Sequence, residues 1–262
     1  MTDAVEHDAR RTVLTMMNAM GGTASVARLL RATDILGVEQ GAVRMALTRL
    51  KSKGALENPK RGVWSLSADG HSTRGHVDAW RVMQSRAMGW DGVSWVMHKA
   101  SGSFQDTASG RARARTTRIL GMRQWRPNLW MRPNNLVAEV GGLRERILSA
   151  PDASQDLVFV AQGLSPADTA EIRALWDVGA LEAGYRACLE RMREAREAAA
   201  QEALGVAARN VYEVGDAVIR TLTVDPLLPR EMIDTGLRAQ CIEAMRRFDV
   251  FGRDLWRQVL EE

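Results

Sequence analysis

Residues 37–66 read GVEQGAVRMALTRLKSKGALENPKRGVWSL, and this stretch predicts a winged helix-turn-helix. After a glycine turn, Val43, Leu47 and Leu50 recur at helical spacing and form one apolar stripe together with Ala46. A second glycine ends the helix, and two short strands follow around a basic turn. A helix followed by such a hairpin is typical of a recognition helix with its wing.

The polar face of this helix offers side chains suited to the edges of bases in a major groove. The predicted DNA-contacting residues of the helix are Gln40, Arg44, Met45, Thr48 and Arg49. The two arginines are expected to contact bases or adjacent phosphates, and the other three to contribute secondary readout. At the hairpin tip, predicted as the turn of residues 58–62, Lys60 and Arg61 are expected to anchor the DNA backbone. The alternative is an ordinary solvated helix face.

Two more helices are expected upstream, over residues 6–20 and 24–36, because each range carries enough apolar residues for a core-facing stripe. Two glycines separate them, and the side-chain oxygen of Thr23 or Ser25 can cap the second helix. Three helices and a wing then account for residues 1 to about 70.

Composition indicates an ordinary globular protein: 262 residues, 45% hydrophobic and 26% charged, which fits about two or three domains. A net charge of +4 permits nucleic acid as a partner without requiring it. The sequence contains no apolar run that could span a membrane and no leader-like start, so we expect a cytoplasmic protein without a membrane partner. Cys188 and Cys241 lack the spacing of a metal site or redox pair and are expected to be reduced and structural.

Four segments carry a family resemblance in a fixed order. They are GVEQGAVRMALTRLKSKGAL (37–56), WDGVSWVM (90–97), GMRQWRPNLWMRP (121–133), and Arg220 followed by DPLLP (225–229). Together they resemble the PaaX-like repressors, which regulate the degradation of phenylacetic acid and related aromatic compounds, over nearly the whole chain. The resemblance implies a homodimer formed through the later domains, a ferredoxin-like middle domain similar to the CRISPR-associated Cas2 nucleases, and an aryl-CoA effector, with phenylacetyl-CoA as the type case.

The middle of the chain alternates strands and helices. Strands are expected at 90–98, within 124–132 around Pro127-Asn128, and at 157–160, with helices at 111–120 and 136–148. This β-α-β-β-α-β order also suits a ferredoxin-like domain. From about Pro166 the chain reads as helical, with one long helix over 180–208 and a last helix over 238–259. At the bend between them, Asp225 is expected to accept hydrogen bonds or to pair with Arg220.

The predicted fold class is therefore α+β, in three domains. They are a winged helix-turn-helix (1–75), a ferredoxin-like middle domain with a connecting helix (76–163), and a helical C-terminal domain for dimerisation and effector binding (164–262).

Enzymatic activity is not expected. A metal-dependent nuclease of the middle domain's kind needs a carboxylate at the C-terminal end of its first strand, but residues 97–101 contain no acid and Asp91 lies at the opposite end, where the strand begins. His71, His76 and His98 lack metal-ligand spacing and are expected at surfaces or boundaries, so no metal and no cofactor is predicted.

Arginines form the densest basic run of the chain, without an intervening acid, at 111, 113, 115, 118, 123, 126 and 132. They can bind phosphates, whether of DNA or of a coenzyme A nucleotide, or they can be solvated and paired with carboxylates elsewhere. The sequence does not choose between these. For an effector pocket, the candidate residues are Trp95, Arg115, Trp130 and Arg132.

The predicted function is a dimeric repressor that binds a palindromic operator, with half-sites spaced by roughly 34 Å or a multiple of it, and that a small effector releases. The alternative is a protein that binds nucleic acid without specificity, or an assembly protein that keeps the fold. A nuclease is the third choice.

Overall fold

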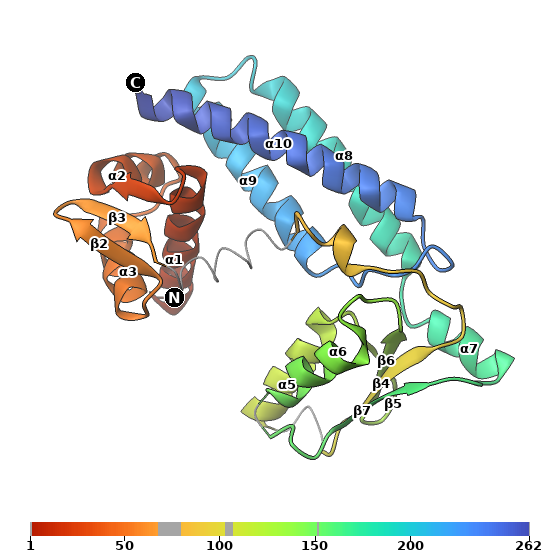
Figure 1. The fold of residues 1–262 in the computed structure, drawn as a ribbon. Helices are drawn as coiled ribbons and strands as arrows, with labels where there is room; N and C mark the ends of the chain where they lie inside the picture. Colours follow the sequence, from red (N-terminus) through yellow and green to blue (C-terminus); the bar gives the residue numbers. More distant parts are fainter. Residues whose placement is uncertain (1, 68–79, 103–106, 151, 262) are drawn as a thin grey trace. The chain divides into compact units, whose positions relative to one another are not determined.

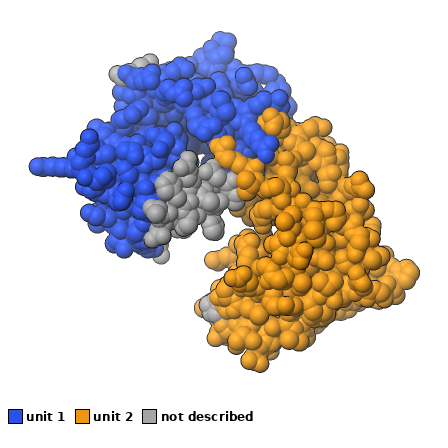
Figure 2. All heavy atoms as spheres, in the orientation of Figure 1, with its two compact units in different colours: residues 1–80, 190–218, 244–262 blue, residues 81–189, 219–243 orange. Residues whose placement is uncertain are grey.

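The computed structural model describes residues 2–67, 80–102, 107–150 and 152–261. The chain divides into two compact units (Figure 2): residues 1–80, 190–218 and 244–262 form unit 1, and residues 81–189 and 219–243 form unit 2. The chain is α+β, with two small antiparallel sheets, one in each unit.

The N-terminal part of unit 1 has the predicted winged-helix architecture (Figure 1). Its elements are α1 (Thr2–Ala19), β1 (Thr23–Ser25), α2 (Val26–Ile35), α3 (Gln40–Ser52), β2 (Leu56–Lys60) and β3 (Val63–Leu66). The sequence did not predict β1, which pairs antiparallel with β3 and completes the sheet order β1-β3-β2. Ser25 caps α2 as expected, because its hydroxyl accepts a hydrogen bond from the Arg28 amide at 3.2 Å.

The predicted apolar stripe of α3 faces the core. Val43 and Ala46 are fully buried, and Leu47 and Leu50 are nearly so. They pack in the small core that α1, α2 and α3 share, which gives α3 a fixed orientation while its other faces stay open.

The remainder of unit 1 comes from parts of α8 (Val178–Ala198), α9 (Leu204–Thr223) and α10 (Thr235–Glu261). Gly252 allows α10 to approach α9 closely, because a Cβ there would lie 3.2 Å from Val211 Cγ1. The rings of Tyr212 and Trp256 meet edge to face between the same two helices, with centroids 6.5 Å apart. Within this unit an ion pair of 3.2 Å joins Arg11 on α1 to Asp216 on α9.

The prediction of a single helix over residues 180–208 was wrong, because residues 199–203 form a turn between α8 and α9. No proline breaks the chain there, and alanine and glutamate favour a helix locally. The helix is interrupted instead by the need to bury apolar side chains on both sides of the turn. The buried residues are Met192 and Ala195 on α8, and Ala207 and Val211 on α9. A reversal between the two helices lets both apolar stripes be covered.

Unit 2 contains the ferredoxin-like order β-α-β-β-α-β that the sequence predicted. The elements of this order are β4 (Trp95–Lys99), α5 (Ala108–Ile119), β5 (Arg123–Arg126), β6 (Leu129–Pro133), α6 (Glu139–Leu148) and β7 (Leu157–Ala161). The short 3₁₀ helix η1 (Gln84–Arg86) precedes them, and α7 (Pro166–Arg173) follows. The sheet order is β5-β6-β4-β7 with every pair antiparallel, and α5 and α6 lie together beside the sheet (Figure 1).

The strand predicted from residue 90 begins only at Trp95. Asp91 Oδ1 accepts hydrogen bonds from the amides of Val93 at 3.0 Å and Ser94 at 2.8 Å. Gly92 has a φ of 82°, which other residues rarely adopt. The segment is therefore a turn, and Trp90 closes it by donating its indole N–H to the Ser94 carbonyl at 2.6 Å. The helix expected from 136 likewise begins later, at Glu139.

The bend after α9 is held by Asp225, which is buried and accepts hydrogen bonds as predicted. Its Oδ1 accepts from the Leu227 amide at 2.7 Å, and its Oδ2 accepts from the Tyr185 hydroxyl. The guanidinium of Arg238 pairs with Asp225 at 3.6 Å, and the pairing with Arg220 stays a prediction. Burial, together with the charge of Asp225, raises the pKa of Tyr185, so the phenol stays a donor.

Both cysteines, Cys188 and Cys241, are buried and are not joined in a disulfide. Among the described residues, no helix is both long enough and apolar enough to cross a membrane.

Candidate nucleic-acid interface

All five residues predicted on the polar face of α3 are exposed: Gln40, Arg44, Met45, Thr48 and Arg49. Met45, the apolar member of the set, is 48% exposed. The Thr48 hydroxyl donates to the Arg44 carbonyl at 3.1 Å, so its own helix occupies it in this state. The structure thus brings the predicted readout residues onto one open surface.

The wing differs in detail from the prediction. The turn expected over residues 58–62 is shorter, because β2 continues to Lys60 and only Arg61 and Gly62 connect it to β3. Pro59 has no N–H for the strand ladder, and the side chain of Asn58 donates instead to the Val63 carbonyl at 2.7 Å. Lys60 and Arg61 are both exposed at this tip.

The candidate effector residues do not form one group. Trp95 pairs in register with Pro133, whereas Trp130 pairs with His98, three residues further along β4. Side chains alternate between the two faces of a strand, so Trp95 and Trp130 point to opposite faces of the sheet. The ring of Trp95 is fully buried between Trp90, at 4.9 Å edge to face, and Trp176, stacked at 6.5 Å.

Arg132 is buried and fully engaged by the protein. Its guanidinium donates to the carbonyls of Leu120 and Pro226 and to Asn135 Oδ1, and Asn135 in turn donates to the Leu227 carbonyl at 2.7 Å. Burial lowers its pKa to about 9, which still leaves it charged at neutral pH. These bonds tie the middle sheet to the bend after α9, which is a structural role.

The structure sorts the arginine-rich segment into two groups. Arg113 and Arg126 pair with carboxylates, of Asp156 at 3.0 Å and of Glu171, and Arg132 is held by carbonyl oxygens. Arg123 also donates to a carbonyl, that of Met122, at 3.1 Å. The other four arginines line one cavity of about 680 Å³, together with Trp130. They are Arg111, Arg115, Arg118 and Arg123. Of the candidate effector residues, the cavity therefore unites Arg115 and Trp130.

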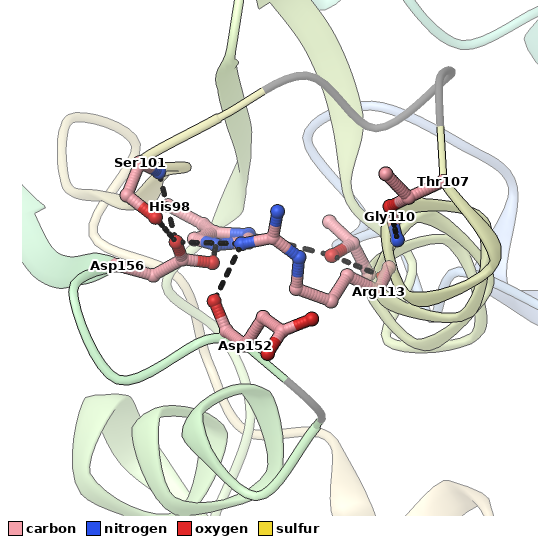
Figure 3. Close-up of polar contacts among 8 residues, drawn as sticks. His98, Ser101, Thr107, Gly110, Arg113, Asp152 and Asp156 are labelled. Atoms are coloured by element: carbon pink, nitrogen blue, oxygen red, sulfur yellow. Dashed lines mark hydrogen bonds and ion pairs between the residues drawn. The ribbon is translucent and has the colours of Figure 1, made fainter.

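A buried polar network that the sequence did not predict lies between β4, α5 and the loop before β7 (Figure 3). His98, expected at a surface or boundary, is in fact fully buried, and its Nε2 lies 2.8 Å from Asp156 Oδ2. Asp156 Oδ1 accepts from the Ser101 amide and hydroxyl, both at 2.8 Å, and from Arg113 at 3.0 Å. Thr117 contacts His98 Nδ1 at 3.3 Å. His71 and His76 lie outside the described residues.

This network shows that one premise of the prediction against a nuclease, the lack of an acid at the end of the first strand, was wrong. The segment after β4 contains no acid, but the fold brings Asp156 to that strand end from 55 residues beyond Ser101. Both oxygens of Asp156 already accept hydrogen bonds from protein donors. Among the described residues, His, Cys, Asp and Glu do not gather in a group of three that could hold a metal ion.

We expect acid to destabilise unit 2 through this network. Burial lowers the pKa of His98 below 6.5. Burial raises the pKa of Asp156, but hydrogen bonds from Ser101 and His98 outweigh it and bring the pKa below 3.8. Between pH 6.5 and the lowered pKa of His98, the unfolded chain binds the proton more tightly than the folded chain, so stability falls as pH falls. Protonation of Asp156 causes a second loss of stability as the pH falls below about 4.

Urea unfolding between pH 8 and pH 4 measures this effect, with His98→Gln as the comparison. Removal of the imidazole should flatten the decline below pH 6.5. An identical pH dependence in both proteins would contradict the assignment.

The fold and the exposed face of α3 define the N-terminal segment as a winged helix-turn-helix. Residues 9–70 match the family model described as PaaX-like protein, which confirms the resemblance over this segment. Among solved structures, the uncharacterized protein Rv0674 from Mycobacterium tuberculosis is similar. Its TM-score is 0.61 at 24% sequence identity, and the match covers 90% of this chain and 91% of that chain, which shows a shared fold. The search of curated proteins found no match.

Proposed function

We propose that this protein is a dimeric transcriptional repressor, not an enzyme, that binds a palindromic operator of an aromatic-compound catabolic operon in the cytoplasm. One observation carries the proposal: α3 buries an apolar stripe while it exposes Arg44, Arg49 and their polar neighbours beside a basic wing. This is the arrangement by which a recognition helix enters a major groove. The match of residues 9–70 to PaaX-like proteins supports the same function class.

The proposed effector is an aryl-CoA thioester such as phenylacetyl-CoA, in keeping with the PaaX-like resemblance. To release the operator, the effector must bind the DNA-incompetent form more tightly than the DNA-bound form, because equal affinity for both shifts nothing.

Replacement of Arg44 by alanine tests sequence-specific binding. If Arg44 reads a base, the variant should lose roughly 1–3 kcal/mol of operator affinity and discriminate less at one position. Fluorescence anisotropy at physiological salt would compare the upstream intergenic DNA with a scrambled duplex.

Lys60→Ala serves as the contrast, because a wing lysine on phosphate should weaken both duplexes alike and reduce the salt dependence of binding. Arg230→Ala is the matched control, since that side chain is 85% exposed and lies outside the winged helix. Equal, weak, steeply salt-dependent binding of the wild-type protein to both duplexes would favour the alternative function: non-specific nucleic-acid binding or assembly.

A further inference from the structure

The cavity of about 680 Å³ in unit 2 is built by α5, β5, β6 and the residue after α9. Arg111, Arg115 and Arg118 lie along one side of α5 at intervals of four and three residues, and Arg123 enters from β5. We call these four residues with Trp130 the arginine pocket. Its volume lies within the range of pockets that hold small molecules and cofactors.

The four guanidinium groups of the arginine pocket are positioned for an anion. Among the described residues, none of the four forms an ion pair with a carboxylate, in contrast to Arg113 on the same helix, which pairs with Asp156. Burial lowers the pKa of Arg123, and the nearby charge of Arg118 lowers it further. The folded chain therefore holds like charges close together, and a bound anion would relieve their repulsion.

The remaining lining of the cavity indicates an organic ligand. Ile119 and Val224 are 45% and 58% exposed, and they give the cavity an apolar wall. The side-chain amide of Gln124 offers both a donor and an acceptor. Arg118 lies over the ring of Trp130, 5.7 Å from its centroid, which orients that guanidinium. Phosphate is an anion that fits these side chains, because arginine binds phosphate through two hydrogen bonds at once. Four guanidinium groups are more than a single phosphate requires.

We propose that the arginine pocket binds a nucleotide-type small molecule through its phosphates, with the base or sugar against the apolar wall and Gln124. If this molecule is the effector, the inference rests on the proposed function. In that case the nucleotide diphosphate end of coenzyme A would occupy the arginine pocket. The acyl group would then lie outside the cluster of guanidiniums.

Isothermal titration calorimetry of the full-length protein with ADP and with free coenzyme A tests the proposal. Arg115→Gln and Arg118→Gln should each weaken binding of both probes about tenfold or more, because each removes a charged hydrogen-bond partner of phosphate. Arg146→Gln on α6 is the matched control, an exposed arginine outside the cavity. It should leave the affinities unchanged, and circular dichroism would verify that each variant is folded.

Anisotropy on the operator and on scrambled DNA distinguishes the possible failures. If the two pocket variants bind ADP and coenzyme A as the wild-type protein does, or if the wild-type protein binds neither, the proposal is wrong. If they instead lose affinity for DNA of any sequence but keep the probes, the cluster contacts DNA, and the proposal is again overturned. If ADP binding depends on Arg115 and Arg118 while the protein shows no operator preference, the arginine pocket stands and the proposed function fails.

Discussion

Replacement of Asp156 by alanine is expected to lower the free energy of unfolding by about 3–5 kcal/mol, the range for removing one partner of a buried ion pair. Asp156 accepts hydrogen bonds from the backbone and hydroxyl of Ser101, and it also contacts His98 and Arg113. Without the carboxylate, Arg113 Nη1 would lose its partner at 3.0 Å and keep the Asp152 carbonyl, at 3.1 Å.

Urea unfolding followed by tryptophan fluorescence measures this loss, and hydrogen exchange of the amides in β4 and β7 locates it. Asp152→Asn is the matched control: the backbone of Asp152, not its side chain, accepts from Arg113, and asparagine tolerates its φ of 57°. A destabilisation of Asp156→Ala no larger than that of the control would show that the network contributes little.

The second large effect is expected for Arg132→Met, which keeps a long side chain but removes the guanidinium. The carbonyls of Leu120 and Pro226 and the amide oxygen of Asn135 would lose a buried donor. Each unsatisfied buried group costs about 1–3 kcal/mol, so we expect a total loss of about 3 kcal/mol or more. The local packing leaves little room to adjust, since a Cβ on Gly121 would lie 2.9 Å from the Pro226 backbone.

This experiment also separates two roles for Arg132. Thermal or urea unfolding of Arg132→Met and Arg132→Lys measures the structural role, and lysine should rescue part of the stability because it keeps the charge but not the planar fork. If instead both variants are as stable as the wild-type protein and bind acyl-CoA more weakly, Arg132 would be an effector ligand, as the sequence prediction had it.

Local patterns explain what was predicted well. The stripe of Val43, Leu47 and Leu50 defines a helix and its buried face within a few residues of each other, and the hairpin follows from a turn between short strands. The order of strands and helices in unit 2 has the same origin, because periodicity and turn residues lie next to each other in the chain.

Competing local interactions account for the errors in element boundaries. The strand predicted from Trp90 is delayed by the Asp91 side chain, which captures two backbone amides and forms a turn. The helix predicted across 199–203 is interrupted although its residues favour a helix, because packing of α8 and α9 outweighs propensity.

By itself, the sequence determined the winged helix, the exposed polar face of its third helix and the α+β class, because these depend on periodicity and on neighbouring residues. Only the tertiary structure decided which arginines pair with protein groups and which line a cavity. It also brought together His98 and Asp156, 58 residues apart. The physical reason is that burial and electrostatic pairing depend on distances in space, and a run of like residues in the chain carries no information about their partners.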